Sequence, residues 1–341
     1  MIHFNQKRIL FLSAHFFGYE EAIVGRLREL GAEVDFFNER PSDTIISKGL
    51  IRMKSKWYQK KINRYYQQIW KQISQRQYDY FLLIKGESIP MFFLENFITT
   101  HPETRKIFYS YDAVSEYPRV AQLFPFFDEN FTFEPTDAEH YQIRLRPLFF
   151  LDIYHTSEAA KKPEYDVVFI GTAHTDRYLV GEEVRYQCKI MNLKTYFYYY
   201  APGKVGFLLK RIFDKKLKTF DFRKLSFQKL SHQQIAEIYK ESFAVLDINK
   251  PFQKGLTMRT FEALAAGKKL LTTNAEIKKY PFYDEVNIHV LNRDDLQIDE
   301  EFFKTPFRGI SEEIRQKMSL DSWIHCLFVE HQDAYWARSF R

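Results

Sequence analysis

The residue types best suited to chemistry gather between positions 249 and 273, where a polar loop containing a glycine leads into a helix start. Arg259 and Glu262 stand about one helical turn apart there. A guanidinium pairs with phosphate, and a carboxylate accepts hydrogen bonds from both hydroxyls of a ribose. The first amide groups of a helix also favour an anion. This stretch therefore predicts a site for a ligand with phosphates and a diol; the alternative is that Glu262 only complements the helix dipole.

A second part of this site is predicted earlier in the chain. Gly171 and Thr172 end an apolar run, and Arg177 opens the helical pattern that follows. A glycine at such a turn lets a ligand approach the backbone, and an arginine adds charge-assisted bonds to phosphate. The same turn is also common for packing reasons alone. The full set that we expect to contact the ligand is Gly171, Thr172, Arg177, Tyr200, Lys254, Thr257, Arg259, Thr260 and Glu262.

Candidates for a general base follow the apolar runs in the first half of the chain. They are His15, Glu87, Asp112 and Glu116, of which we expect His15 and Asp112 to be catalytic. A histidine exchanges protons readily near neutral pH, and Asp112 ends an apolar run in the same layer. A lone histidine in a loop is more often structural than catalytic, so the sequence leaves both roles open.

These residues need secondary structure that brings them to one edge of a sheet. Apolar runs alternate with helical patterns throughout, which predicts an α/β fold with parallel sheets. Ligands of such sheets bind beyond the carboxyl ends of the strands. The expected strands are 8–12, 33–37, 80–84, 106–110, 130–133, 165–170, 195–200, 243–247, 269–272 and 288–291, and the expected helices include 21–30, 58–73, 90–98, 231–240, 260–266 and 320–336.

The stretch 259–267, R-T-F-E-A-L-A-A-G, resembles the donor-site signature of GT-B glycosyltransferases, especially of the CgeB-like and capsule or lipopolysaccharide branch. The run D-V-V-F-I-G-T at 166–172 with Arg177, and S-x-x-x-W at 319–323, are similar to the same branch. The resemblance covers about residues 163–330, and the earlier residues match only in their α/β pattern.

The resemblance implies a GT-B fold, with two Rossmann-like domains facing across a cleft and a C-terminal helix returning to the first domain. It implies an acceptor domain at 1–160, a nucleotide-sugar donor domain at 161–319 and the returning helix at 320–341. The implied activity is transfer of a sugar from a nucleotide-diphosphate sugar to a surface glycan, such as capsule, lipopolysaccharide or a lipid-linked glycan. No metal and no cofactor are implied, because basic side chains and helix amides hold the leaving diphosphate.

One departure from the resemblance concerns Lys254, which stands where many retaining members carry a glutamate eight positions before Glu262. We expect Lys254 to face the diphosphate instead, and the sequence leaves retention or inversion of the anomeric centre open. Two other functions also remain open. One is a non-catalytic protein that binds glycan or nucleotide sugar, and the other is a nucleotide-sugar epimerase. For an enzyme of the implied class, we expect Arg259→Ala to weaken donor binding without lowering the melting temperature.

Composition excludes several classes of protein. The 341 residues are 45% hydrophobic and 28% charged, which is typical of globular domains rather than disordered chains. The cysteines, Cys188 and Cys326, are far apart, so we expect neither a disulfide framework nor a cysteine zinc site. No signal peptide and no membrane span are expected. We expect a cytoplasmic protein.

Charge is concentrated in two basic strips on a chain with a net charge of +6. Residues 44–78 carry +9 and residues 204–229 carry +7. Both strips contain apolar residues at helical spacing, which predicts peripheral binding to an anionic membrane, with Trp57, Ile69 and Trp70 entering the interface. The alternative is that each strip is the solvated face of a helix packed on its own domain. Nucleic acid is not expected, because no zinc-finger or aromatic ribonucleoprotein motif accompanies the charge.

Overall fold

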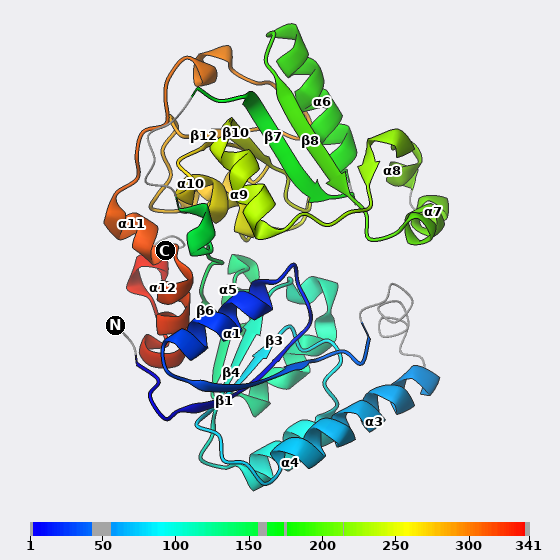
Figure 1. The fold of residues 1–341 in the computed structure, drawn as a ribbon, viewed down its shortest axis with the longest axis vertical. Helices are drawn as coiled ribbons and strands as arrows, with labels where there is room; N and C mark the ends of the chain where they lie inside the picture. The colour runs from blue at the N-terminus through cyan, green and yellow to red at the C-terminus, as the bar shows by residue number, and fades with distance from the viewer. Residues whose placement is uncertain (1–2, 43–55, 156–161, 174–175, 214, 338–341) are drawn as a thin grey trace. The chain divides into compact units, whose positions relative to one another are not determined.

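The computed structural model describes residues 3–42, 56–155, 162–173, 176–213 and 215–337. Its contacts divide the chain into two compact units (Figure 1). Unit 1 contains the residues up to Pro147 together with Ile324–Ala337, and unit 2 contains Leu148–Trp323. Part of the first basic strip, residues 44–55 with Lys48, Arg52 and Lys54, lies outside the described residues.

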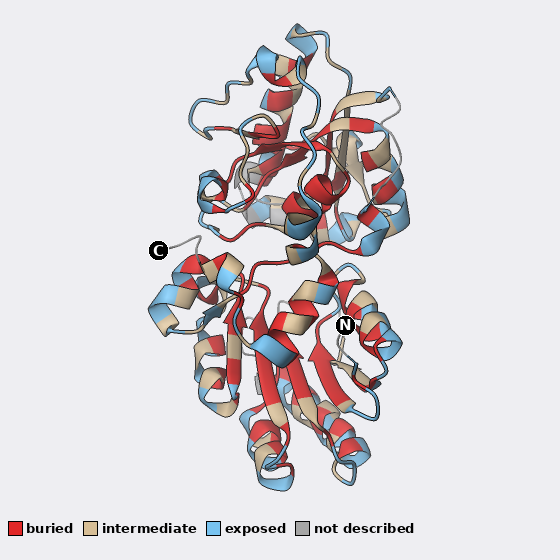
Figure 2. Ribbon diagram, turned by 90° about the vertical axis from the view of Figure 1, so that its left-hand side faces the viewer, coloured by how far each residue is buried: buried red, intermediate tan, exposed pale blue. Residues whose placement is uncertain are grey.

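Unit 1 is built on a six-stranded parallel sheet with the strand order β2-β1-β3-β4-β5-β6. The central strands are apolar on both faces because helices cover both sides, and they are buried (Figure 2). The strands are β1 (Arg8–Ser13), β2 (Glu33–Asn38), β3 (Tyr80–Ile84), β4 (Arg105–Ser110), β5 (Glu129–Thr132) and β6 (Arg144–Leu145). The helices are α1 (Tyr19–Glu29), α3 (Lys56–Ile73), α4 (Met91–Thr100) and α5 (Pro135–Tyr141).

Helix α3 is the amphipathic helix expected from the first basic strip. Its apolar face belongs to the core of unit 1, where Tyr58, Ile62, Tyr66, Ile69 and Ile73 are buried. The expectation that Ile69 enters a membrane interface is therefore wrong, because its side chain is 1% exposed. Trp70 packs against the same core, its ring 5.9 Å from the ring of Phe93. Of the expected interfacial residues in α3, Trp57 is exposed.

Unit 2 repeats the architecture with the strand order β12-β11-β10-β7-β8-β9, again all parallel. The strands are β7 (Tyr165–Thr172), β8 (Thr195–Tyr200), β9 (Leu225–Ser226), β10 (Ser242–Asp247), β11 (Lys269–Thr272) and β12 (Ile288–Val290). The helices are α6 (Arg177–Ile190), α7 (Lys204–Phe213), α8 (Lys215–Lys218), α9 (His232–Lys240), α10 (Met258–Ala265) and α11 (Glu312–Lys317). The two parallel sheets confirm the α/β fold class expected from the alternating pattern.

Local sequence explains where two helices of unit 2 begin and end. Ser231 caps α9 with a reciprocal capping box, in which Ser231 and Gln234 each accept a hydrogen bond from the other's backbone amide. Helix α10 ends before Gly267, whose φ of +66° lies in the left-handed region that favours glycine. Both boundaries were expected from the residue types.

The C-terminal segment belongs to unit 1 from Ile324 to Ala337, and it is not one continuous helix. It consists of α12 (Leu320–His325), a π-helical turn at Cys326–Glu330, and α13 (Ala334–Ala337). His331 has a φ of +57°, which interrupts the helix, and the Asp333 carboxylate accepts the amide of Tyr335 to start α13. The ring of Phe328 lies 5.3 Å from that of Phe4 in unit 1.

The strand orders locate the ligand-binding edge of each sheet. In unit 1 the order reverses direction between β1 and β3, and in unit 2 it reverses between β7 and β10. At such a switch point the connections leave toward opposite faces of the sheet, which leaves a crevice beyond the carboxyl ends of the strands. The residues that follow β1, β3, β7 and β10 are therefore the ones to inspect.

Candidate functional site

A buried carboxylate, Asp247, organises the switch point of unit 2. It ends β10 and is 1% exposed. Its Oδ2 accepts the hydroxyls of Thr257 and Thr260 at 2.7 and 2.8 Å, and its Oδ1 lies 2.8 Å from Nη1 of Arg259. Asp247 thus fixes three of the predicted donor-site residues. It was missed from the sequence, although its place at the end of an apolar strand is the signal that singled out Asp112.

Arg259, a predicted phosphate ligand, also makes structural hydrogen bonds at this edge of the sheet. Its Nη2 donates to the Ile170 carbonyl at the end of β7. A Cβ on Gly171 would lie 3.3 Å from this Nη2 and 2.7 Å from the Phe169 ring. The Phe169 ring, and to a smaller extent Arg259, thus leave little room for a side chain at position 171, which favours the packing explanation for Gly171.

Arg177 lies close enough to Arg259 and Asp247 to sense their charges, and it bonds to Thr172. Arg177 donates from Nη1 to the Thr172 hydroxyl at 2.9 Å and from Nε to the Ile248 carbonyl at 2.8 Å. Burial and the neighbouring Arg259 guanidinium lower the pKa of Arg177 to about 9. The charged form of Arg177 is thus destabilised in this structure, and an anion bound nearby would relieve that cost.

A further arginine, Arg293, joins the same edge and was not anticipated from the sequence. Its Nη1 lies 2.5 Å from Asp176, and its Nη2 donates to the side chains of Asn249 and Thr273 at 2.9 and 3.0 Å. Arg293 follows the last strand by a short loop, and no local motif marks it.

The start of helix α10 faces the loop after β10. Its N-cap, Thr257, makes no side-chain bond to the first amides of the helix, because its hydroxyl donates to Asp247. Lys254 is exposed in the same loop, and its carbonyl accepts the Asn274 amide at 2.9 Å. Tyr200 is half-buried at the end of β8 and pairs in register with Thr172. This edge therefore combines the start of a helix that has no side-chain cap with several guanidinium groups. Both features are suited to binding a diphosphate.

Glu262 is buried on α10 and meets a tyrosine. It hydrogen-bonds to Tyr154, whose hydroxyl also lies 2.7 Å from Nδ1 of His232. Burial and the Glu262 carboxylate raise the pKa of Tyr154 above its ordinary value. Tyr154 and His232 were missed from the sequence, because neither belongs to the stretch that carries Glu262.

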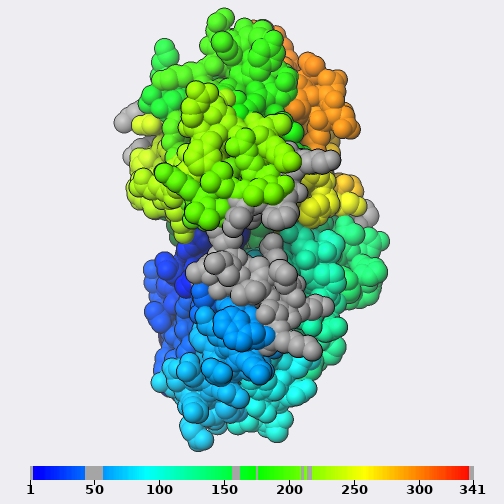
Figure 3. All heavy atoms as spheres, turned by 90° about the vertical axis from the view of Figure 1, so that its right-hand side faces the viewer, coloured from blue at the N-terminus to red at the C-terminus, as the bar shows by residue number. Residues whose placement is uncertain are grey.

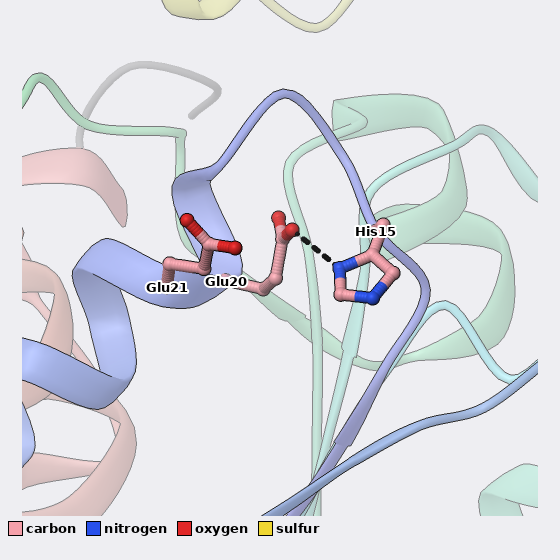
Figure 4. Close-up of side chains that lie close together, drawn as sticks. All are labelled: His15, Glu20 and Glu21. Atoms are coloured by element: carbon pink, nitrogen blue, oxygen red, sulfur yellow. Dashed lines mark hydrogen bonds and ion pairs between the residues drawn. The ribbon is translucent and has the colours of Figure 1, made fainter.

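In unit 1, His15 follows β1 and faces the start of α1 (Figure 4). Its Nδ1 lies 2.8 Å from Oε1 of Glu20, and Oε2 of Glu20 accepts the amide of Phe16 at 2.9 Å. The Glu20 side chain is 3% exposed, whereas that of His15 is 46% exposed. When Nδ1 donates to Glu20, Nε2 remains an acceptor that can take a proton.

His15, Glu20 and Glu21 also form a group whose ligand atoms lie within 4.8 Å of one another (Figure 4). An imidazole and two carboxylates are donors that several divalent metals accept. Both oxygens of Glu20 are already engaged, by His15 and by the Phe16 amide, so a metal would compete with these bonds.

Asp112 belongs to a buried charge network at the ends of β3 and β4. Its carboxylate lies 2.8 Å from Nζ of Lys85, which lies 3.1 Å from Glu87. Glu87 also pairs with Arg40, and both side chains are 4% exposed. Burial lowers the pKa of Lys85, but Asp112 and Glu87 outweigh it and leave the pKa raised. Sequence reasoning proposed the carboxylates and missed the cations that neutralise them.

The two expected catalytic residues, His15 and Asp112, are linked through contacts of their neighbours. The Phe16 ring lies 5.7 Å from that of Tyr111, which precedes Asp112. The ammonium of Lys85 lies 6.0 Å from the centre of the same Phe16 ring. Glu116 is half-buried in a short 3₁₀ turn at Val114–Glu116.

Comparison with known proteins gives similarity in structure but none in sequence. The chain matches no protein-family model and no curated protein. A structure of HepE from Anabaena in complex with UDP and glucose is similar with a TM-score of 0.57 at 11% identity, covering 93% of this chain and 97% of that one. The catalytic domain of starch synthase IV from Arabidopsis thaliana, bound to ADP and acarbose, gives 0.54 at 10% identity, covering 98% and 99%.

A third similar structure is the apo form of the lipopolysaccharide outer core galactosyltransferase WaaB. It has a TM-score of 0.50 at 9% identity, and 98% of each chain is covered. These structural neighbours are GT-B glycosyltransferases, and the likeness extends over nearly the whole chain. Together with the two parallel six-stranded sheets, it shows that this chain has the GT-B fold.

Proposed function

We propose that the protein is a glycosyltransferase that moves a sugar from a nucleotide-diphosphate sugar to a glycan acceptor. The observation that supports this most is the edge formed by β7, β10 and the start of α10. Buried guanidinium groups, uncapped helix amides and the lowered pKa of Arg177 favour an anion there. We further propose that the acceptor is a surface glycan or its lipid-linked precursor.

In this proposal the donor binds to unit 2 by its diphosphate and its ribose. Arg177, Arg259 and Lys254 stabilise the diphosphate, whose negative charge increases as the glycosidic bond breaks. Glu262 accepts the ribose hydroxyls, and Tyr154 holds its carboxylate in place. Lys254 is the residue best suited to a test of donor binding. Its side chain is exposed, so its substitution should change binding without changing the stability of the fold.

The acceptor binds to unit 1, where His15 acts as the general base. A new bond forms between the acceptor oxygen and the anomeric carbon, and the bond from that carbon to the diphosphate oxygen breaks. The hydroxyl proton passes to Nε2 of His15, whose ring is oriented by Glu20. Asp112, paired with Lys85, is the second catalytic residue in this proposal.

Calorimetric titration with UDP and ADP tests the donor site, because these nucleotides are bound in the similar structures of HepE and starch synthase IV. We expect Lys254→Gln to weaken nucleotide-diphosphate binding about tenfold, since a charge-assisted bond is lost. The matched control is Lys189→Gln, an exposed lysine in the last turn of α6. Equal binding by both variants and the unaltered protein would refute this assignment of the site.

The same protein should then be supplied with nucleotide sugars and glycan acceptors. A glycoside product supports transfer. Donor binding without any product would identify a binding protein, and conversion of the donor without an acceptor would identify an epimerase. We also propose that the protein is cytoplasmic. The free, buried thiols of Cys188 and Cys326 are compatible with a reducing compartment.

A further inference from the structure

Helix α7 in unit 2 carries apolar side chains on its outer surface. Val205, Leu208 and Ile212 are 72%, 47% and 65% exposed. Their spacing of three and four residues places them on one face of the helix. Figure 3 looks onto this side of unit 2, where the segment is drawn in yellow-green. An apolar stripe in water is unfavourable, so this face is suited to a partner.

The other side of α7 is firmly attached to unit 2. Phe207 is 3% exposed, and its ring lies 5.5 Å from that of Phe220. Arg211 donates to the Lys218 carbonyl at 2.8 Å, which ties α7 to α8. The exposed stripe is therefore held in a fixed orientation by the core beneath it.

Basic residues lie close to the stripe in sequence, beginning with Lys204 in the first turn of α7. Lys204, Lys218, Arg223 and Lys229 are exposed. One of the two acids in the strip, Asp221, is paired with Arg223 at 3.0 Å. An apolar stripe edged by cations is complementary to a surface that is apolar inside and anionic outside, which is the interface of an anionic bilayer.

We infer that helix α7 docks unit 2 onto an anionic lipid surface. Val205, Leu208 and Ile212 enter the level of the head groups, and the cations beside them bind lipid phosphates. The stripe is too short to hold the protein alone, so binding requires both contributions and weakens as salt screens the charges.

Helix α3 provides the contrast within the same chain. It is also amphipathic and basic, with Lys60 and Arg64 exposed. Its apolar side is buried in the core of unit 1, so it offers charge without a continuous apolar stripe. Helix α6 also exposes Leu179, Tyr186 and Ile190, but its sequence contains the acids Glu182 and Glu183, whereas the sequence of α7 contains basic residues and no acid. None of the described helices is long and apolar enough to span a bilayer, so the inferred contact lies at the surface.

Sedimentation with lipid vesicles tests this inference without any sugar donor, so its outcome is separate from the proposed activity. We expect the unaltered protein to bind phosphatidylcholine vesicles containing about 30% phosphatidylglycerol and not pure phosphatidylcholine. Binding should fall steeply between about 0.05 and 1 M salt. Equal binding to both vesicle types would overturn the inference.

Two variants separate the stripe from the charge. The triple variant Val205→Gln, Leu208→Gln and Ile212→Gln keeps the net charge and should lower the bound fraction about tenfold. Lys204→Glu with Lys218→Glu should do the same, whereas the matched reversal Lys60→Glu with Arg64→Glu in α3 should retain most of the binding. Unchanged melting temperatures verify folding, because all substituted side chains are exposed.

Two results would assign the stripe to another partner. If the triple variant binds vesicles as well as the unaltered protein, the stripe does not contact lipid. If the unaltered protein ignores vesicles but sediments as a dimer that the triple variant lacks, the stripe joins two copies of the chain. Either result overturns the lipid inference.

Discussion

At the scale of single residues, the paired roles of Arg259 change what its removal should do. Its guanidinium is buried against Asp247, and breaking a buried ion pair leaves the partner charge without compensation. We expect Arg259→Ala to lower the free energy of unfolding by about 3–5 kcal/mol, and to weaken nucleotide binding. Urea unfolding and calorimetry measure the two effects. The sequence had suggested the second effect alone, because it does not show the partner.

A double variant checks the cause of that destabilisation. Adding Asp247→Asn to Arg259→Ala removes the uncompensated charge while leaving an acceptor for Thr257 or Thr260. The double variant should recover part of the lost stability without recovering nucleotide binding. No recovery would mean that the pairing with Asp247 is not the source of the loss.

His15 and Glu20 make a second prediction at this scale. We expect His15→Ala to lower kcat about 10²–10⁴-fold with little change in melting temperature, since its side chain is half exposed. Glu20→Gln keeps a hydrogen-bond acceptor but not the charge, and should lower kcat with the donor KM unchanged. Steady-state kinetics distinguish these results. An undiminished kcat in His15→Ala would move the base elsewhere and leave the donor site as proposed.

At the scale of elements, the buried charge network at the ends of β2 and β3 contains a carboxylic acid with a raised pKa, Glu39. Glu39 is fully buried, and burial together with the Glu87 carboxylate raises its pKa to about 8, against the opposing effects of Arg40 and Lys85. The phenol of Tyr66 on α3 also faces it. The folded state therefore keeps a proton that the unfolded state releases near pH 4.5.

This difference predicts how stability depends on pH. Because the folded state binds more protons between about pH 4.5 and 8, the Glu39 contribution to the free energy of unfolding falls as pH rises through that range. Glu39→Gln should match the unaltered protein near pH 5 and exceed it by more than about 1 kcal/mol above pH 8. Urea unfolding at both pH values measures this, with the exposed Glu95→Gln as control. A difference that does not grow with pH would refute the assignment.

The elements themselves were largely predictable, because buried parallel strands are continuous apolar runs and α9 has a complete capping box. The partners of the site residues were not. Arg293 reaches Asp176 across 117 positions, and Arg177 reaches Ile248 across 71, so no local pattern contains them. Nor does helical periodicity distinguish a face that meets the core from one that meets solvent. For this reason α3 and α7 looked alike in sequence and differ in the structure.

At the scale of the whole molecule, the fold is shared with enzymes at only 9–11% identity, which leaves the chemistry to be decided by experiment. Arginines and helix amides can replace a metal at the diphosphate, and no Asp-x-Asp motif occurs in the sequence. We therefore expect EDTA to leave transfer activity unchanged. Loss of activity in EDTA that Mn²⁺ restores would instead direct attention to His15, Glu20 and Glu21.

The placement of the C-terminal segment has a consequence for biosynthesis. Trp336 is fully buried, and the guanidinium carbon of Arg146 lies 5.4 Å from the centre of its ring, so residues 324–337 complete the core of unit 1. The stretch Leu148–Trp323 of unit 2 separates the two segments of unit 1 in the sequence. On the ribosome, the unit whose synthesis begins first is thus the last to have all its residues. Until residues 324–337 have been synthesised, the surface of unit 1 that receives Phe328 and Trp336 stays exposed to solvent. A released chain that ends at residue 323 should therefore leave unit 1 sensitive to protease while unit 2 is resistant, which limited proteolysis measures.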